Sequence, residues 1–218
     1  MIVVSWVYKR VQRYDVPGHA HFLTFSCYQR LPLLSNEVWR TWLGANVRSA
    51  CDELAVALWA YVFMPEHVHL LVRPCREKYR IADFLYRVKK PLAERVLRSL
   101  EENAAPLLTK LTVVERGKEG HRFWQAGGGF DVNIWTMAKA VEKARYCHRN
   151  PVARRLVQAP EQWRWSSFRG LELGKTPHEP LGLDAWDEAL AQPQRELRTA
   201  PRAVAPDEGP HGMGAPVV

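Results

Sequence analysis

The sequence has no long hydrophobic run and no paired cysteine motif. No stretch approaches the roughly 20 apolar residues that a membrane-spanning helix needs. The opening segment MIVVSWVYKR also lacks the basic start and the small-residue cleavage site of a signal peptide. The four cysteines form no C-x-x-C pair, which excludes the usual zinc and redox motifs. These absences predict a cytoplasmic protein with reduced thiols and no membrane partner.

Acidic residues are fewer than basic ones. The 218 residues include 31 Lys and Arg against 23 Asp and Glu, which gives a net charge of +8. An excess of this kind suits a polyanionic partner such as nucleic acid. Many proteins are mildly basic, so charge alone leaves a nucleic-acid partner and an ordinary basic surface about equally favoured.

The apolar pattern predicts an α+β domain. The expected elements are a strand at 21–29, a helix from the Asn36 cap to about 54, a hairpin of strands 57–63 and 67–72, an amphipathic helix at 78–100, a loop or short hairpin at 101–122, a weak strand at 131–134 and a helix at 135–150. We expect Pro91 to kink or divide its helix and Pro151 to stop the last one. The order of these strands and helices along the chain is ferredoxin-like, with helices on one face of an antiparallel sheet.

The motif His67-Val68-His69 lies on one of the expected strands. Residues two apart on a strand point to the same face, so both imidazoles lie side by side while Val68 points into the core. Two imidazoles and a third polar group can hold a divalent metal. A pair of histidines on a solvated strand face is the plainer alternative, and Glu66 either assists the pair or ends the turn.

Tyr146 lies off the apolar stripe of the last expected helix. Its neighbours one turn away are charged or polar, and a structural tyrosine more often lies on the stripe. Asn150, four residues later, projects beside Tyr146 and either completes a metal site or caps the helix end. A phenol is a poor nucleophile at neutral pH, but a cation beside a scissile phosphate would assist its attack and give a covalent tyrosyl–DNA link.

Several motifs together resemble one family. FMPEHVHLLV resembles the HUH motif of single-strand tyrosine transposases, and FWQAGGGFDVNI, YCHRNPVARRLV and WRWSSF are similar to segments of REP-associated tyrosine transposases, as is HFLTFSCYQRLPLL. The resemblance covers roughly residues 17 to 168. This chain departs from the family in the three glycines after FWQ and in Cys147, where Ile is commoner. Neither departure removes a catalytic group.

The resemblance implies a ferredoxin-like domain of the HUH endonuclease type. It implies an enzyme dependent on Mg²⁺ or Mn²⁺ that cuts single-stranded DNA near hairpins, such as repetitive extragenic palindromes (REP), and rejoins strands. Tyr146 is then the nucleophile, and His67, His69 and Asn150 are the metal ligands. The implied organisation is an N-terminal extension at 1–16, the catalytic domain at 17–170 and a C-terminal extension at 171–218, largely disordered after about 188.

The expected helix at 78–100 carries a basic face. We expect phosphate contacts from five of its residues: Arg80, Arg87, Lys89, Lys90 and Arg95. The alternative is an ordinary solvated helix face.

Three other functions use similar residues. A domesticated DNA-hairpin-binding protein would keep the fold without cutting. A cupin-like metalloenzyme would need a Glu shortly after the second His, where this chain has LLVRP, and a histidine-triad hydrolase would need a third alternating His, where it has Leu71. The sequence leaves open monomer or homodimer, and an active site within one chain or shared between two.

Overall fold

The computed structural model describes residues 14–127, 129–173, 181, 183 and 184. The expected N-terminal extension, apart from its last residues, and most of the expected C-terminal extension, including the tail after 188, lie outside the described residues.

The centre of the fold is a four-stranded antiparallel sheet with strand order β2-β3-β1-β6. Its strands are β1 (Ala20–Ser26), β2 (Val56–Phe63), β3 (His67–Pro74) and β6 (Phe130–Ile134). The expected hairpin of β2 and β3 is confirmed, and so is the α+β antiparallel class. Since β1 lies between β3 and β6, it aligns residues of both neighbours: Thr24 pairs with His69 on one side and with Phe130 on the other.

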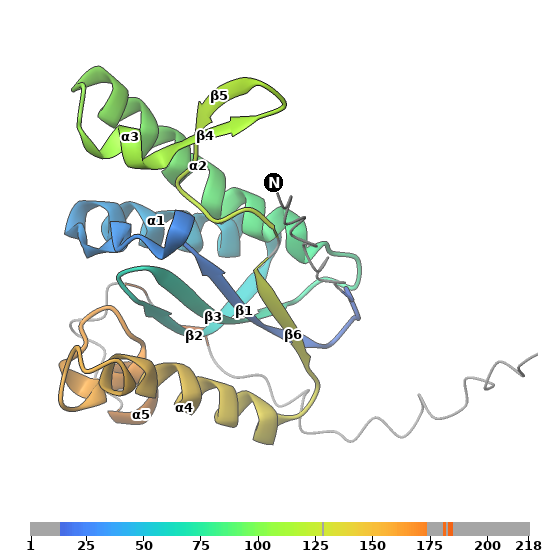
Figure 1. Ribbon diagram of the computed structural model, residues 1–218. Helices are drawn as coiled ribbons and strands as arrows, with labels where there is room; N and C mark the ends of the chain where they lie inside the picture. The colour runs from blue at the N-terminus through green and yellow to red at the C-terminus, as the bar shows by residue number, and fades with distance from the viewer. Residues whose placement is uncertain (1–13, 128, 174–180, 182, 185–218) are drawn as a thin grey trace, which may run out of the picture.

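Helices cover both faces of the sheet, which corrects the expectation of helices on one face. In Figure 1, α1 (Glu37–Leu54) and α2 (Ile81–Glu102) lie above the sheet and α4 (Met137–Ala153) lies below it. The sheet is apolar on both sides, because Leu23 and Phe25 face α1 and α2 while Phe22 and Leu71 face the other way. A second apolar face must be buried too, and α4 covers it with a core of small residues: Ala140, Ala144 and Cys147.

The prolines inside the helices do not end them. α2 is a single helix across Pro91, because its buried residues continue on both sides of the proline. α4 continues through Pro151 to Ala153, three residues beyond the expected end, and Pro151 is buried. Packing thus outweighs the loss of one backbone hydrogen bond at each site. The expected Asn36 cap is confirmed, since its side chain accepts hydrogen bonds from the backbone N–H groups of Val38 and Trp39.

Smaller elements complete the chain. The segment 101–122, expected as a loop or a short hairpin, contains a hairpin that projects away from the sheet in Figure 1. The hairpin consists of β4 (Thr112–Glu115) and β5 (Lys118–His121) and follows α3 (Leu107–Leu111). The remaining short helices are η1 (Tyr28–Arg30), η2 (Leu33–Ser35), η3 (Pro160–Gln162) and α5 (Phe168–Leu173). In the part of the chain that the structure describes, no helix is long and apolar enough to cross a membrane.

Candidate active site

His67 and His69 lie on the face of β3 that α4 covers. Val68 points the opposite way, into the core beneath α1 and α2. Both histidines are buried, with 5% and 4% of their surface exposed. The pair therefore lies inside the molecule and not on a solvated strand face, as the plainer alternative would have it.

The Nε2 atoms of the two imidazoles face each other, and each Nδ1 atom has a hydrogen-bond partner on the opposite side of its ring. Their Nε2 atoms are 3.0 Å apart. The Nδ1 atom of His69 lies 2.8 Å from the Thr24 hydroxyl, and the Nδ1 atom of His67 lies 3.2 Å from a Glu66 carboxylate oxygen. Because an ionised carboxylate only accepts hydrogen bonds, the Nδ1 atom of His67 carries the hydrogen and its Nε2 atom presents a lone pair.

Burial keeps both imidazoles neutral. Desolvation lowers the pKa of His69 to about 3, an effect that the neighbouring His67 increases. Desolvation also lowers the pKa of His67, although the negative charge of Glu66 opposes this effect. A neutral imidazole with a free lone pair is the form that binds a metal, so the pair is ready to act as ligands near pH 7.

α4 brings Tyr146 and Asn150 to the histidines within one chain. The Tyr146 ring centroid lies 6.0 Å from the ring of His69 and 6.0 Å from that of Phe22. Tyr146 is 56% exposed, so its phenol is accessible to a large substrate. Asn150 donates a hydrogen bond to the backbone carbonyl of Tyr146 at 3.0 Å, and its side chain also hydrogen-bonds to His69. The fold thus gathers all four residues that the sequence singles out.

A buried hydrogen-bond network fixes α4 to the edge of the sheet. The segment containing Ser166 and Ser167 runs beside β2, and the Ser167 hydroxyl donates to the carbonyl of Tyr61 at 3.2 Å. The same oxygen accepts a bond from the Tyr61 N–H at 2.9 Å and lies 2.8 Å from Nε2 of His148. His148 is two residues from Tyr146, so this network sets where the tyrosine lies. The WRWSSF motif was the only sequence signal of it.

Glu66 joins three separate segments at the site. Besides His67, its carboxylate pairs with Arg154 at 2.9 Å and with Arg30 at 3.5 Å. Arg154 follows the end of α4 and Arg30 lies in the turn after β1. Sequence reasoning left the role of Glu66 open and missed both arginines and Thr24, because no local pattern connects residues that meet only in the fold. The two half-exposed arginines place positive charge beside the histidines.

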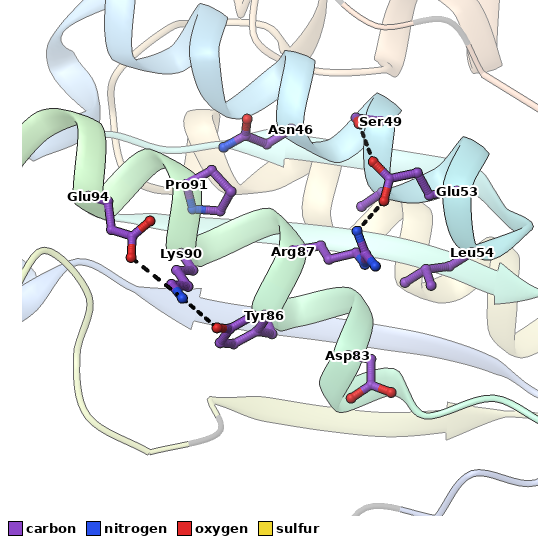
Figure 2. A pocket seen from close by; sticks show the side chains of 11 residues that line it. Asn46, Ser49, Glu53, Leu54, Asp83, Tyr86, Arg87, Lys90, Pro91 and Glu94 are labelled. Carbon is purple, nitrogen blue, oxygen red and sulfur yellow. Dashed lines mark hydrogen bonds and ion pairs between the residues drawn. The ribbon is translucent and has the colours of Figure 1, made fainter.

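The basic residues of α2 lie on the other side of the sheet. Figure 2 shows Arg87 directed toward Glu53 of α1, while Lys90 contacts Tyr86 and Glu94 of its own helix. The others also have partners within the chain: Arg80 pairs with Asp83, Lys89 lies over Phe25, and Arg95 lies over Trp42. The structure does not bring these five residues to the histidine pair.

The donor set fits a divalent cation. Among the described residues, no three His, Cys, Asp or Glu side chains gather where they could hold a metal ion. Two imidazole nitrogens and the Asn150 amide oxygen are nevertheless three neutral donors of types that bind divalent metals. Thr24 and Glu66 orient the imidazoles in the way that outer partners orient metal-bound histidines.

The burial of His148 predicts acid sensitivity. Burial lowers the pKa of His148 from 6.5 to about 4. Between these values the unfolded chain binds a proton that the folded chain excludes, so stability falls as the pH drops, by up to about 1.4 kcal/mol per pH unit. His148→Gln, which does not titrate, should show a shallower loss of unfolding free energy between pH 6.5 and 4 in urea titrations. Equal slopes for the variant and the wild type would contradict this, and the comparison above pH 7 is the control.

The chain is similar to known transposases. Residues 17–117 match the model of the IS200-like transposase family; this segment contains both histidines and ends before Tyr146. A solved structure of a REP-associated tyrosine transposase bound to a REP hairpin matches with a TM-score of 0.55 and 18% identity, over 83% of this chain and 94% of that chain. A structure of a proposed transposase from Deinococcus radiodurans R1 has a TM-score of 0.41 and 19% identity, over 64% of this chain and 93% of that chain.

A comparison with curated proteins found no match. The TM-score of 0.55 shows that the ferredoxin-like arrangement of this chain is also the fold of the REP-associated enzyme. By the match over residues 17–117, this part of the chain is similar to the IS200-like transposases.

Proposed function

We propose that this protein is a transposase that acts as a metal-dependent endonuclease and strand transferase on single-stranded DNA near hairpins. The DNA partner is supported by the REP hairpin in the structure that shares this fold. The catalytic domain in this proposal is residues 17–170, with extensions on either side. The observation that carries the proposal is the 3.0 Å approach of His67 and His69, with the exposed phenol of Tyr146 beside them in the same chain.

His67, His69 and Asn150 would hold the metal. When bound, a divalent cation would polarise the phosphoryl group and neutralise charge that develops on it. Two nitrogen donors favour Mn²⁺ over the harder Mg²⁺, although either ion would serve in the cell.

Tyr146 would act as the nucleophile. Its hydroxyl oxygen forms a bond to the scissile phosphorus while the bond from phosphorus to the 3′ oxygen breaks. The phenolic proton passes to the solvent that reaches Tyr146, and the departing 3′ oxygen takes up a proton. The 5′ end is then held as a phosphotyrosine. A 3′-hydroxyl that attacks this link later rejoins the strand and returns the phenol.

Tyr146→Phe should abolish cleavage and the covalent adduct while DNA binding stays within about twofold, because only the hydroxyl is lost. The measurement is adduct formation on labelled hairpin oligonucleotides with Mn²⁺, resolved under denaturing conditions, with mass mapping of the modified residue.

Tyr86→Phe is the matched control, because Tyr86 is similarly exposed but lies on α2. A denaturant-resistant adduct that persists in Tyr146→Phe would refute the assignment of the nucleophile. Hairpin binding by a wild-type protein that forms no adduct would favour the non-cleaving, domesticated alternative.

Glu66→Gln should weaken Mn²⁺ binding about tenfold, since the charge that orients His67 and raises its basicity is lost. Isothermal titration of the protein with Mn²⁺, without DNA, measures the effect. Glu53→Gln, in the layer on the far side of the sheet, is the control and should bind as the wild type does. If Glu66→Gln binds Mn²⁺ as tightly as the wild type, Glu66 does not support the metal ligands.

We further propose that Arg80, Arg87, Lys89, Lys90 and Arg95 contact DNA phosphates away from the cleavage site. Arg80→Gln and Lys90→Gln should each lower the slope of log K against log salt by about 0.7, as expected for one lost contact to single-stranded DNA. Fluorescence anisotropy across a salt series checks this, with Lys110→Gln on α3 as the control. Unchanged slopes would leave α2 with an ordinary solvated surface.

A further inference from the structure

Phe130 is a large apolar side chain left open at the edge of the sheet. It begins β6 and is 55% exposed, although the next residues on its face, Val132 and Ile134, pack into the core under α4. The exposed Phe130 ring does not gain the stabilising free energy that its neighbours gain from burial of apolar surface. The ring is therefore available to a ligand.

The sheet register places Phe130 beside the candidate active site. Phe130 is opposite Thr24, and Thr24 is opposite His69, so the three side chains point to the same face along one row. Two strand spacings separate Phe130 from His69, about 10 Å. Thr24, between them, also holds the His69 ring through its hydroxyl.

Tyr146 lies over the same corner of the sheet. Its ring contacts Phe22, and Phe22 is opposite Val132. Phe130 is thus a diagonal neighbour of Phe22, at about 7–8 Å across the strands. A phosphate between Tyr146 and the histidines would bring an adjoining base within reach of the Phe130 ring.

The chain entering β6 holds Phe130 in place. Gly129 has a φ of +71° and lies so close to Thr24 that a Cβ atom would collide with the Thr24 carbonyl. Only glycine fits this approach, and the contact fixes the backbone immediately before Phe130. The ring is therefore presented from a defined position and not from a loose loop.

Positive charge lies on the same side of α4. Lys139 and Lys143 precede Tyr146 by seven and three residues, which puts all three on one side of the helix. The Lys143 ammonium lies 5.9 Å from the centre of the Tyr146 ring, and Lys139 and Lys143 pair with Glu142 at 2.6 and 3.3 Å. Aromatic rings together with cationic groups bind unpaired nucleotides, and the cations here lie at Tyr146.

We propose that Phe130 is a stacking platform for the unpaired nucleobase next to the scissile phosphate. The inference rests on the proposed function, because it takes that phosphate to lie between Tyr146 and the histidine pair. The ligand is a single-stranded nucleotide of any base, since stacking on a π-face is tolerant of sequence. Phe130 would hold the strand in register for attack and take no part in bond making.

The direct test is photocross-linking of Tyr146→Phe protein to an unpaired oligonucleotide of about ten nucleotides that carries 5-iodouracil in place of thymine. This halogenated base couples to an aromatic side chain stacked on it, and mass spectrometry identifies the residue. We expect the adduct at Phe130. An adduct only at other residues would overturn the proposal.

Variants give a second readout. Phe130→Ala should weaken oligonucleotide binding about tenfold, in line with the loss of one stacked base, and Phe130→Trp should restore it. Trp135→Ala is the matched control: Trp135 is 56% exposed but lies beyond the other end of β6, about 16 Å along the chain. Equal affinity for Phe130→Ala and the wild type would also overturn the proposal.

The two proposals fail in different ways. If the wild type forms a tyrosyl adduct while no cross-link reaches Phe130, the platform is wrong and the proposed function stands. If the cross-link reaches Phe130 but the wild type forms no adduct with Mn²⁺, the platform stands as a DNA-binding feature and the proposed chemistry is wrong.

Discussion

The approach of two neutral imidazoles at 3.0 Å is the constraint on which the site depends. Two lone pairs facing each other repel, so this geometry requires either a shared hydrogen or a cation between the nitrogens. Glu66 and Thr24 hold the rings from the opposite side and stop them from rotating away. Burial removes the alternative of protonating both rings. The rest of the fold around the site places Tyr146, the proposed nucleophile, beside this pair.

The second helical layer makes the site possible. α4 packs on the sheet through Ala140 and Ala144, whose small side chains allow the helix to lie close to β2 and β3. A thicker interface would hold Tyr146 and Asn150 away from the histidines. His148 and the Arg154–Glu66 pair then fix the far end of the helix to β2 and β3. The same helix thus buries one face of the sheet and carries the proposed nucleophile.

The sheet also separates two basic surfaces. The arginines near Glu66 and the lysines of α4 lie on the side of the histidine pair, while the cations of α2 belong to the helical layer that lies above the sheet in Figure 1. Several α2 cations are already paired with acidic or aromatic side chains of their own layer. A DNA strand held at Tyr146 would meet the α4 side first, because that side contains the exposed phenol and Phe130.

The sequence by itself determined most of the elements and which candidate site residues share a face. Alternation placed His67 and His69 on one face of a strand, helical spacing joined Tyr146 to Asn150, and the order of elements predicted the antiparallel α+β sheet. These are local properties, because they follow from backbone periodicity over a few residues. Two features of α4 do not follow from such local patterns: it continues past Pro151, and it covers the second face of the sheet. Burial of an apolar surface decided both.

Only the tertiary structure decided which distant residues meet. Thr24 reaches His69 because the register of β1 and β3 places them opposite each other, and Arg154 reaches Glu66 because α4 crosses the sheet toward β2. Phe130 lies near the histidines for the same reason, through β6. Hydrogen bonds and ion pairs between segments more than 40 positions apart leave no periodic pattern in the sequence. The residues that support the histidine pair can therefore be identified only from the folded structure.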